Sequence, residues 1–212
     1  MSRSEQRIPT LPTRGRANRR KLLAEAERLL LESDGSPLRF SEVCEAPGVS
    51  LGSAYRIYIG IDDLLQDLAT EWINNFVDFL KTSDPGSPPD NWAQLSDFIV
   101  RRGADYWRET ADTMRVLPRI RSKSPSSYDA AIHDMSVCVA EIFSRYFVVP
   151  AIPGWLSRLA FFSQICDITF ADAVRSEGRI SEQRLTEAET LCRTYLAFYL
   201  PTRLPARDPT EN

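Results

Sequence analysis

Residues 40–65, FSEVCEAPGVSLGSAYRIYIGIDDLL, constrain the fold of this 212-residue chain more than any other stretch. The segment predicts two short helices joined by a tight turn, with a third helix starting directly after them. Gly48 lies at the break, where a residue that tolerates positive φ can reverse the chain without a Cβ clash. Ser50 stands where its hydroxyl can cap the second helix. The apolar residues of that helix recur at helical spacing and can face inward: Leu51, Ala54 and Tyr58.

The outer side of the second helix is polar, and a short polar helix on a small helical support fits the major groove of DNA. We therefore interpret this segment as a DNA-binding unit. Ser53 and Tyr55 are expected to contact phosphates. Leu51, Gly52 and Arg56 are expected to approach base edges. The complete candidate set for DNA binding is Arg14, Arg16, Arg19, Arg20, Arg39, Ser50, Leu51, Gly52, Ser53, Tyr55 and Arg56.

The distribution of charge favours the same interpretation, although the net charge of −3 taken alone argues against a nucleic-acid binder. Residues 1–21 hold seven basic residues and one acidic residue, so this segment carries +6 and the rest of the chain −9. A basic arm on an acidic body is typical of a protein that meets phosphate at one end. The alternative is a solvated tail that has no partner.

The run GVSLGSAYR at residues 48–56, followed by Leu64, resembles the helix-turn-helix signature of the TetR family of transcriptional regulators, A-G-V-S-x-G-T-L-Y-x-Y-F-x-x-K-x-x-L. The resemblance covers about the first third of the chain. It implies a homodimer that binds a palindromic operator in double-stranded DNA, acts as a repressor in the bacterial cytosol or nucleoid, and is released by a small-molecule effector.

The motif and the residues before it depart from the family pattern, and four of the departures concern capping or DNA contacts. Pro47 replaces an alanine, and Arg39 replaces a threonine that often caps the first helix. Ile57 replaces an aromatic residue or histidine, and Ile61 replaces a lysine. The two isoleucines remove two expected phosphate contacts, which supply much of the affinity for DNA. They support an alternative, in which a TetR-like helical dimer has weak or lost DNA binding and binds a small molecule or a protein.

The rest of the chain shows helical periodicity and no alternating strand pattern, so the predicted fold class is all-α. The expected domains are a flexible basic arm at 1–15, a three-helix DNA-binding domain at 16–62, a larger helical effector-binding and dimerisation domain at 63–200, and a disordered tail at 201–212. The predicted helices cover about 17–33, 62–81, 91–109, 112–121, 125–149 and 155–177, and a last one starts at Ser181.

Large aromatic residues gather in the middle helices, and most of them are expected in the core. The family resemblance implies that some line a pocket for an effector that is mostly apolar or aromatic, since such pockets have few polar anchors. The candidate pocket residues are Trp72, Phe76, Phe98, Arg102, Tyr106, Trp107, Tyr128, His133, Phe143, Phe162, Cys166 and Phe170. Gln164, Asp167 and Thr169 are further candidate polar anchors.

The helix predicted at 155–177 is apolar nearly all round, so it must be covered on two sides. One side is expected to meet the core and the other a second subunit, while an intrachain core alone is the alternative. The candidate interface residues are Phe161, Gln164, Ile168, Leu191, Tyr195 and Phe198.

Other classes of protein receive no support from the sequence. One histidine, no phosphate-binding loop and no Cys/His metal spacing argue against an enzyme, a metal site or a cofactor. No apolar run is long enough to span a membrane, and the arginine-rich start does not resemble a signal peptide. The four cysteines lie inside apolar helical patterns, so we expect them to be reduced and buried, with a redox switch as the lesser alternative.

Overall fold

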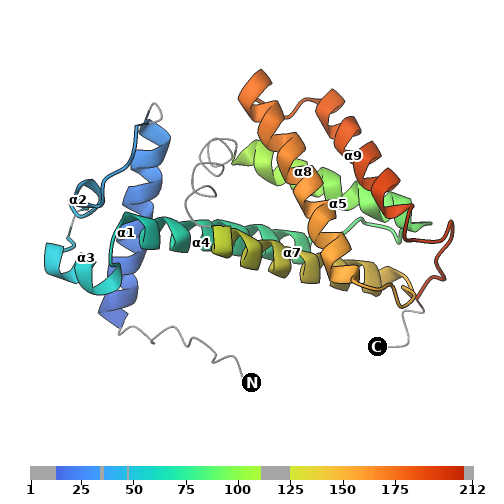
Figure 1. Cartoon of the computed structure of the whole chain (residues 1–212), viewed down its shortest axis with the longest axis horizontal. Coiled ribbons are helices and arrows are strands. Elements are labelled where there is room, and N and C mark those ends of the chain that lie inside the picture. The colour runs from blue at the N-terminus through green and yellow to red at the C-terminus, as the bar shows by residue number, and fades with distance from the viewer. Residues whose placement is uncertain (1–12, 34–35, 47, 111–124, 208–212) are drawn as a thin grey trace. The chain divides into compact units, whose positions relative to one another are not determined.

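The computed structural model describes residues 13–33, 36–46, 48–110 and 125–207 (Figure 1). These residues form helices, and the one pairing of strand type among them is an isolated antiparallel bridge between Phe147 and Ala206. The all-α prediction is therefore confirmed. The helices are α1 (Thr13–Glu32), α2 (Phe40–Val43), α3 (Leu51–Ile57), α4 (Ile61–Thr82), α5 (Trp92–Glu109), α7 (Pro125–Tyr146), α8 (Trp155–Glu177) and α9 (Glu182–Leu196).

The chain forms two compact units, Met1–Leu68 and Ala69–Asn212, with the division inside α4. Helix α1 starts at Thr13, so Arg14 lies on a helix and not on the arm expected at 1–15. The helix expected at 112–121 lies outside the described residues. No helix in the described part of the chain combines the length and apolarity needed to cross a membrane.

In the first unit, α1 packs against both α2 and α3 through an apolar stripe. Leu22, Leu23, Ala26 and Leu30 are buried on α1. They meet a small core from the following helices, which consists of Phe40, Val43, Val49, Ala54 and Tyr58. Burial of side chains of this size contributes roughly 1.5–3 kcal/mol each relative to full exposure.

One carboxylate joins three parts of the first unit. Arg19 on α1 donates two hydrogen bonds to Asp67 on α4, from Nε at 2.7 Å and from a terminal nitrogen at 2.6 Å. The Tyr58 hydroxyl, at the end of α3, donates to the same carboxylate at 2.5 Å. Burial, followed by this hydrogen bond to Asp67, raises the pKa of Tyr58, so its proton is retained. Asp67 thereby fixes the end of α3 against α1 and the start of α4.

In the second unit, α8 packs against both α7 and α9, and α9 packs against α5 (Figure 1). Several ion pairs connect α5 to α9: Arg193 lies 2.6 Å from Asp97, Arg101 lies 2.7 Å from the buried Glu189, and Arg108 lies 2.7 Å from Glu182. The indole N–H of Trp92 donates to the carbonyl of Pro201 at 2.8 Å. These contacts align the last helix with α5 along its length.

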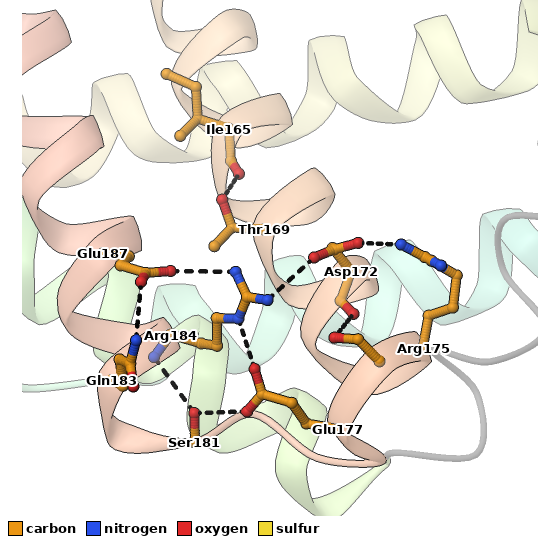
Figure 2. A network of polar contacts seen from close by, with 10 residues as sticks. Ile165, Thr169, Asp172, Arg175, Glu177, Ser181, Gln183, Arg184 and Glu187 are labelled. Atoms are coloured by element: carbon orange, nitrogen blue, oxygen red, sulfur yellow. Dashed lines mark hydrogen bonds and ion pairs between the residues drawn. The ribbon is translucent and has the colours of Figure 1, made fainter.

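The turn between α8 and α9 is held by a polar network centred on Arg184 (Figure 2). Its guanidinium contacts Glu177 at 2.7 Å and Asp172 at 3.3 Å on α8, and Glu187 at 3.2 Å on its own helix. Ser181 caps α9 by accepting a hydrogen bond from the Arg184 N–H at 3.4 Å. The planar guanidinium can satisfy three carboxylates at once, which fixes the geometry of the turn.

Residues 201–207 differ from the disordered tail that the sequence predicts. The Val148 N–H donates to the carbonyl of Pro205 at 2.8 Å, and the Arg207 N–H donates to that of Tyr146 at 2.8 Å. Leu204 is buried. Prolines prevent a helix in this segment, but they leave carbonyl groups that pair with the chain after α7. The segment is therefore ordered through tertiary contacts, which the local composition does not reveal.

Replacing Tyr58 by Phe should lower the free energy of unfolding by about 1–2 kcal/mol at pH 7, because a hydrogen bond to a carboxylate is lost. Since the folded-state pKa of Tyr58 is raised, its contribution is complete below the unfolded-state pKa of about 10 and is lost at higher pH. Urea unfolding followed by circular dichroism at pH 7 and above pH 10 would measure both effects. Tyr55→Phe, at an exposed ring, is the matched control. Equal stability of the two variants would contradict this role of Tyr58.

Candidate nucleic-acid interface and ligand cavity

The turn between α2 and α3 has the geometry that its sequence predicts. Gly48 adopts a φ of +75°, in the left-handed region where side chains are strained. Ser50 is the N-cap of α3, and its hydroxyl accepts a hydrogen bond from the Ser53 N–H at 3.3 Å. Arg39 precedes α2 without a side-chain cap, and its backbone N–H donates to the Glu42 carboxylate at 2.8 Å. Glycine and serine thus determine where α3 begins.

The inner and outer faces of α3 are clearly separated. Ala54 and Tyr58 are buried as expected. Leu51 is 57% exposed, so the expectation that it faces inward is wrong, because the first residue of α3 lies at the end of the small core. Tyr55 is 56% exposed, and one edge of its ring packs on Phe40 at a centroid distance of 5.1 Å. The outer face therefore combines apolar and polar groups.

The polar groups of this face are connected to one another. The Arg56 guanidinium donates to the Gly52 carbonyl at 3.1 Å and to the Ser53 hydroxyl at 3.2 Å. The hydroxyl groups of Ser50 and Ser53 lie 2.8 Å apart. A Cβ added at Gly52 would meet no atom within 4 Å, so the surface above this glycine is open. These contacts hold Arg56 along the exposed side of α3.

The other candidate basic residues divide into two groups. Arg14, Arg16, Arg20 and Arg39 are exposed in the first unit. Arg19 is held by Asp67 and stabilises the unit itself.

The surface around the end of α3 carries apolar side chains. Ile59 is 90% exposed, and Ile57 and Ile61 are partly exposed. Ile57 and Ile61 thus place apolar groups where the family pattern has residues that contact phosphate.

The second unit contains a cavity of about 620 Å³, counted with the space at its opening to solvent. Its walls come from α4, α5, α7 and α8. Aromatic rings and aliphatic side chains make up most of the lining, and Ser163, Cys166 and Asp167 supply its polar atoms. A mostly apolar wall with few polar groups is the usual form of sites that bind small organic molecules.

Five of the candidate pocket residues line this cavity: Phe76, Trp107, Phe162, Cys166 and Phe170. Others lie elsewhere in the second unit. Phe143 is fully buried against Trp155, His133 is exposed, and Arg102 stacks over Phe79 at 4.4 Å. Tyr106 packs against Phe76 and Phe79, Trp72 is buried, and Phe98 is half-buried. The side chain of Tyr128 lies outside the described residues.

Comparison with family models finds no match, and comparison with curated proteins finds no significant match. Solved structures, in contrast, are similar over most of the chain. A TetR-family transcriptional regulator from Streptomyces coelicolor matches with a TM-score of 0.67 and 16% identity, over 86% of this chain and 99% of that one. The chain has the TetR fold.

Two further neighbours were solved with aromatic ligands. The TetR-like regulator LfrR from Mycobacterium smegmatis, in complex with proflavine, has a TM-score of 0.53 and 18% identity, over 85% of this chain and 96% of that one. RolR, in complex with resorcinol, has a TM-score of 0.52 and 13% identity, over 90% and 98%. LfrR and the protein from Streptomyces coelicolor are both described as transcriptional regulators.

Sequence reasoning missed most of the small and aliphatic residues that line the cavity. They are Ile73, Leu80, Ile99, Val100, Gly103, Ala131, Ile132, Met135, Val139 and Ser163. In the sequence these residues belong to the same helical stripes as core residues, so periodicity does not distinguish them. Gly103 is the one residue of this set that the sequence could have indicated, because a glycine inside a predicted helix often has a packing or functional reason. Asp167, a candidate anchor, does line the cavity.

The candidate interface residues lie on α8, on α9 and, in the case of Phe198, just after the end of α9. Ile168 is 65% exposed and Phe198 is 80% exposed, and Phe161 and Leu191 are exposed with them. Gln164 and Tyr195 are half-buried, and the rings of Phe161 and Tyr195 lie 5.0 Å apart. Exposed apolar side chains from two packed helices therefore form one face, which we call the α8–α9 face. Within the described residues, no group of side chains could hold a metal ion.

Replacing Gly48 by Ala should destabilise the first unit by about 1 kcal/mol, because an alanine at positive φ is strained. Its Cβ would also lie 2.8 Å from the Lys21 Nζ, which can move aside since it ends a flexible side chain. Gly52→Ala is the matched control. It should stabilise α3 by about 0.5–1 kcal/mol, because its site is helical and open. Equal thermal stability of the two variants would contradict this account of the turn.

Proposed function

We propose that this protein is a ligand-responsive transcriptional regulator that binds double-stranded DNA through α3. The observation that carries the proposal is the α2–turn–α3 unit, in which a capped helix presents Ser53, Tyr55 and Arg56 on an exposed face. Side chains on such a helix can reach base edges in the major groove, and nearby basic residues can contact phosphates. Arg14, Arg16 and Arg20 are the candidates for the phosphate contacts.

We further propose that the protein acts as a homodimer and that the α8–α9 face is the interface. A single helix of this length contacts few base pairs, whereas a two-fold dimer doubles the contacts and reads a palindrome. Large apolar side chains that are exposed on one face mark sites of association. In this proposal, Phe161, Ile168 and Phe198 meet their symmetry equivalents.

The effector in this proposal is a small, mostly apolar aromatic molecule that binds in the cavity of the second unit. The aromatic walls provide its contacts, and Ser163 and Asp167 offer polar ones. The TetR-fold neighbours that hold proflavine and resorcinol support an aromatic ligand. An effector can release DNA only if it binds one conformation of the dimer more tightly than the other. A repressor located in the bacterial cytosol fits this mode of action.

A second candidate function is suggested by the apolar surface after α3. Ile59 is almost fully exposed, and Ile57 and Ile61 do not supply hydrogen bonds to phosphate. A TetR-fold dimer of this kind would bind a small molecule or a protein and would have little affinity for DNA.

Selection of genomic DNA fragments by the purified protein, at two salt concentrations, separates the two functions. We expect enrichment of a palindrome and weaker binding at higher salt, since phosphate contacts release counterions. Arg56→Ala should weaken binding to the selected site by about 1–3 kcal/mol or relax its sequence preference. Arg28→Ala is the matched control, because Arg28 is an exposed arginine of the same unit that pairs with Glu25 and Glu32.

Two further variants make this experiment more specific. Gly52→Ala adds a methyl group that contacts nothing in the free protein, so a loss of affinity would report close approach of DNA. Ile168→Glu should yield a monomer in sedimentation and abolish binding to the palindrome, whereas Val148→Glu, at another exposed apolar residue, should not. No enriched sequence, or binding that does not respond to salt, would favour the second function.

Filling the cavity should block the ligand without unfolding the protein. Gly103 lies in the wall, and an added Cβ would make ordinary contacts with Phe76 at 3.5 Å and Phe170 at 3.7 Å. Gly103→Leu should therefore lower the affinity for a bound aromatic probe such as proflavine by about tenfold or more, equivalent to about 1.4 kcal/mol. Gly103→Ala is the control and should bind nearly as wild type. Calorimetric titration measures both, and equal binding by Gly103→Leu would exclude this cavity.

A further inference from the structure

Two cysteines that lie far apart in the sequence meet in the second unit. Cys166 on α8 and Cys192 on α9 are separated by 26 positions, and their sulfur atoms lie 3.4 Å apart. Both are free thiols. A disulfide bond is about 2.05 Å long, so the sulfur atoms need to approach by roughly 1.4 Å, which is within reach of rotation about χ1. The packing of α8 on α9 thus creates a dithiol.

The two thiols differ in their access to the cavity. Cys166 is partly exposed and belongs to the cavity wall, together with Phe162 and Phe170. Cys192 is fully buried, and its sulfur lies 3.8 Å from the carbonyl of Phe162. A molecule in the cavity therefore meets Cys166 first, with Cys192 directly adjacent to it.

The environment also assigns different chemical roles to the two sulfur atoms. The hydrogen bond with Cys166, followed by burial, raises the pKa of Cys192, so Cys192 remains a protonated thiol. The thiolate is the nucleophilic form of cysteine. Because Cys166 lines the cavity and Cys192 does not, Cys166 is the thiol for the first attack, and Cys192 is the neighbour that can react with its product.

We propose that Cys166 and Cys192 form a redox-active dithiol, which an aromatic hydroperoxide entering the cavity converts to an intramolecular disulfide. The mostly apolar wall favours an organic hydroperoxide over hydrogen peroxide. This inference goes beyond the proposed function: it rests on the cavity as a site that admits small molecules and does not require DNA binding.

The reaction proceeds in two balanced steps. The Cys166 thiolate attacks the terminal oxygen of the hydroperoxide ROOH, an S–O bond forms, and the O–O bond breaks. The leaving alkoxide takes up the thiol proton and departs as the alcohol ROH, which leaves a sulfenic acid on Cys166. The Cys192 thiol then loses its proton to the departing oxygen as its sulfur attacks the Cys166 sulfur, the S–S bond forms, and the S–O bond breaks. The hydroxide leaves as water with the Cys192 proton, so two thiols are oxidised and ROOH is reduced by two electrons.

Peptide mapping of the full chain after treatment with cumene hydroperoxide tests the proposal. We expect loss of two of the four free thiols and a cross-linked peptide that joins Cys166 to Cys192. Hydrogen peroxide at the same concentration should react more slowly, and Gly103→Leu should slow the reaction with cumene hydroperoxide more than that with hydrogen peroxide. A cross-link between two chains, or oxidation of Cys44 or Cys138 before Cys166, would overturn the proposal.

Three variants assign the roles of the sulfur atoms. Cys192→Ala should stop at a sulfenic acid on Cys166, which dimedone captures, and Cys166→Ala should leave Cys192 reduced. Cys138→Ala is the matched control, because Cys138 is a buried cysteine on α7 beside the carbonyl of Val77, and its variant should still form the disulfide. If Cys166→Ala lost thiols as fast as wild type, the proposal would fail. The wild-type peptide map remains decisive even if a variant does not fold.

Failure of this proposal can be distinguished from failure of the proposed function. A chain that binds proflavine in the cavity but forms no Cys166–Cys192 cross-link retains the effector site and lacks the dithiol chemistry. A chain that forms the cross-link but selects no DNA sequence has the dithiol chemistry and lacks the proposed DNA-binding function.

Discussion

Helix α8 carries apolar side chains around most of its circumference, and the second unit is arranged to cover them. Phe162 and Phe170 are buried beside α5 and α7, where the walls do not close completely and the cavity lies. Cys166 faces this cavity and contacts Cys192 on α9. Phe161 and Ile168 stay exposed. The core, the cavity, the Cys166–Cys192 pair and the α8–α9 face therefore all involve side chains of α8. The other helices of the second unit cover α8 only in part.

The first unit depends on a different kind of contact. It is small, and its core consists mainly of one stripe on α1 and a few residues of α2 and α3. Asp67 adds directional hydrogen bonds from Arg19 and Tyr58, which fix the orientation of the end of α3. Charge-assisted hydrogen bonds are stronger and more specific in direction than apolar contacts. The orientation of the exposed face of α3 thus depends on the hydrogen bonds that Arg19 and Tyr58 donate to Asp67.

The same arginine shows how local and tertiary information differ. In the sequence, Arg19 belongs to a run of basic residues and is expected on a DNA surface. In the structure, its guanidinium lies against a carboxylate 48 positions away. Composition determines that the segment is basic, whereas the partner of each side chain depends on which helices meet. Arg14, Arg16 and Arg20 keep their exposed positions.

The sequence by itself determined the features that depend on neighbouring residues. These are the helical class, the positive φ at Gly48, the cap at Ser50 and the inward side of Ala54 and Tyr58, because each follows from local periodicity or backbone sterics. Only the tertiary structure decided which aliphatic residues line a cavity, that Leu204 is buried, and that Cys166 meets Cys192. The physical reason is that these features depend on which helices pack together and on how completely their side chains fill the space between them.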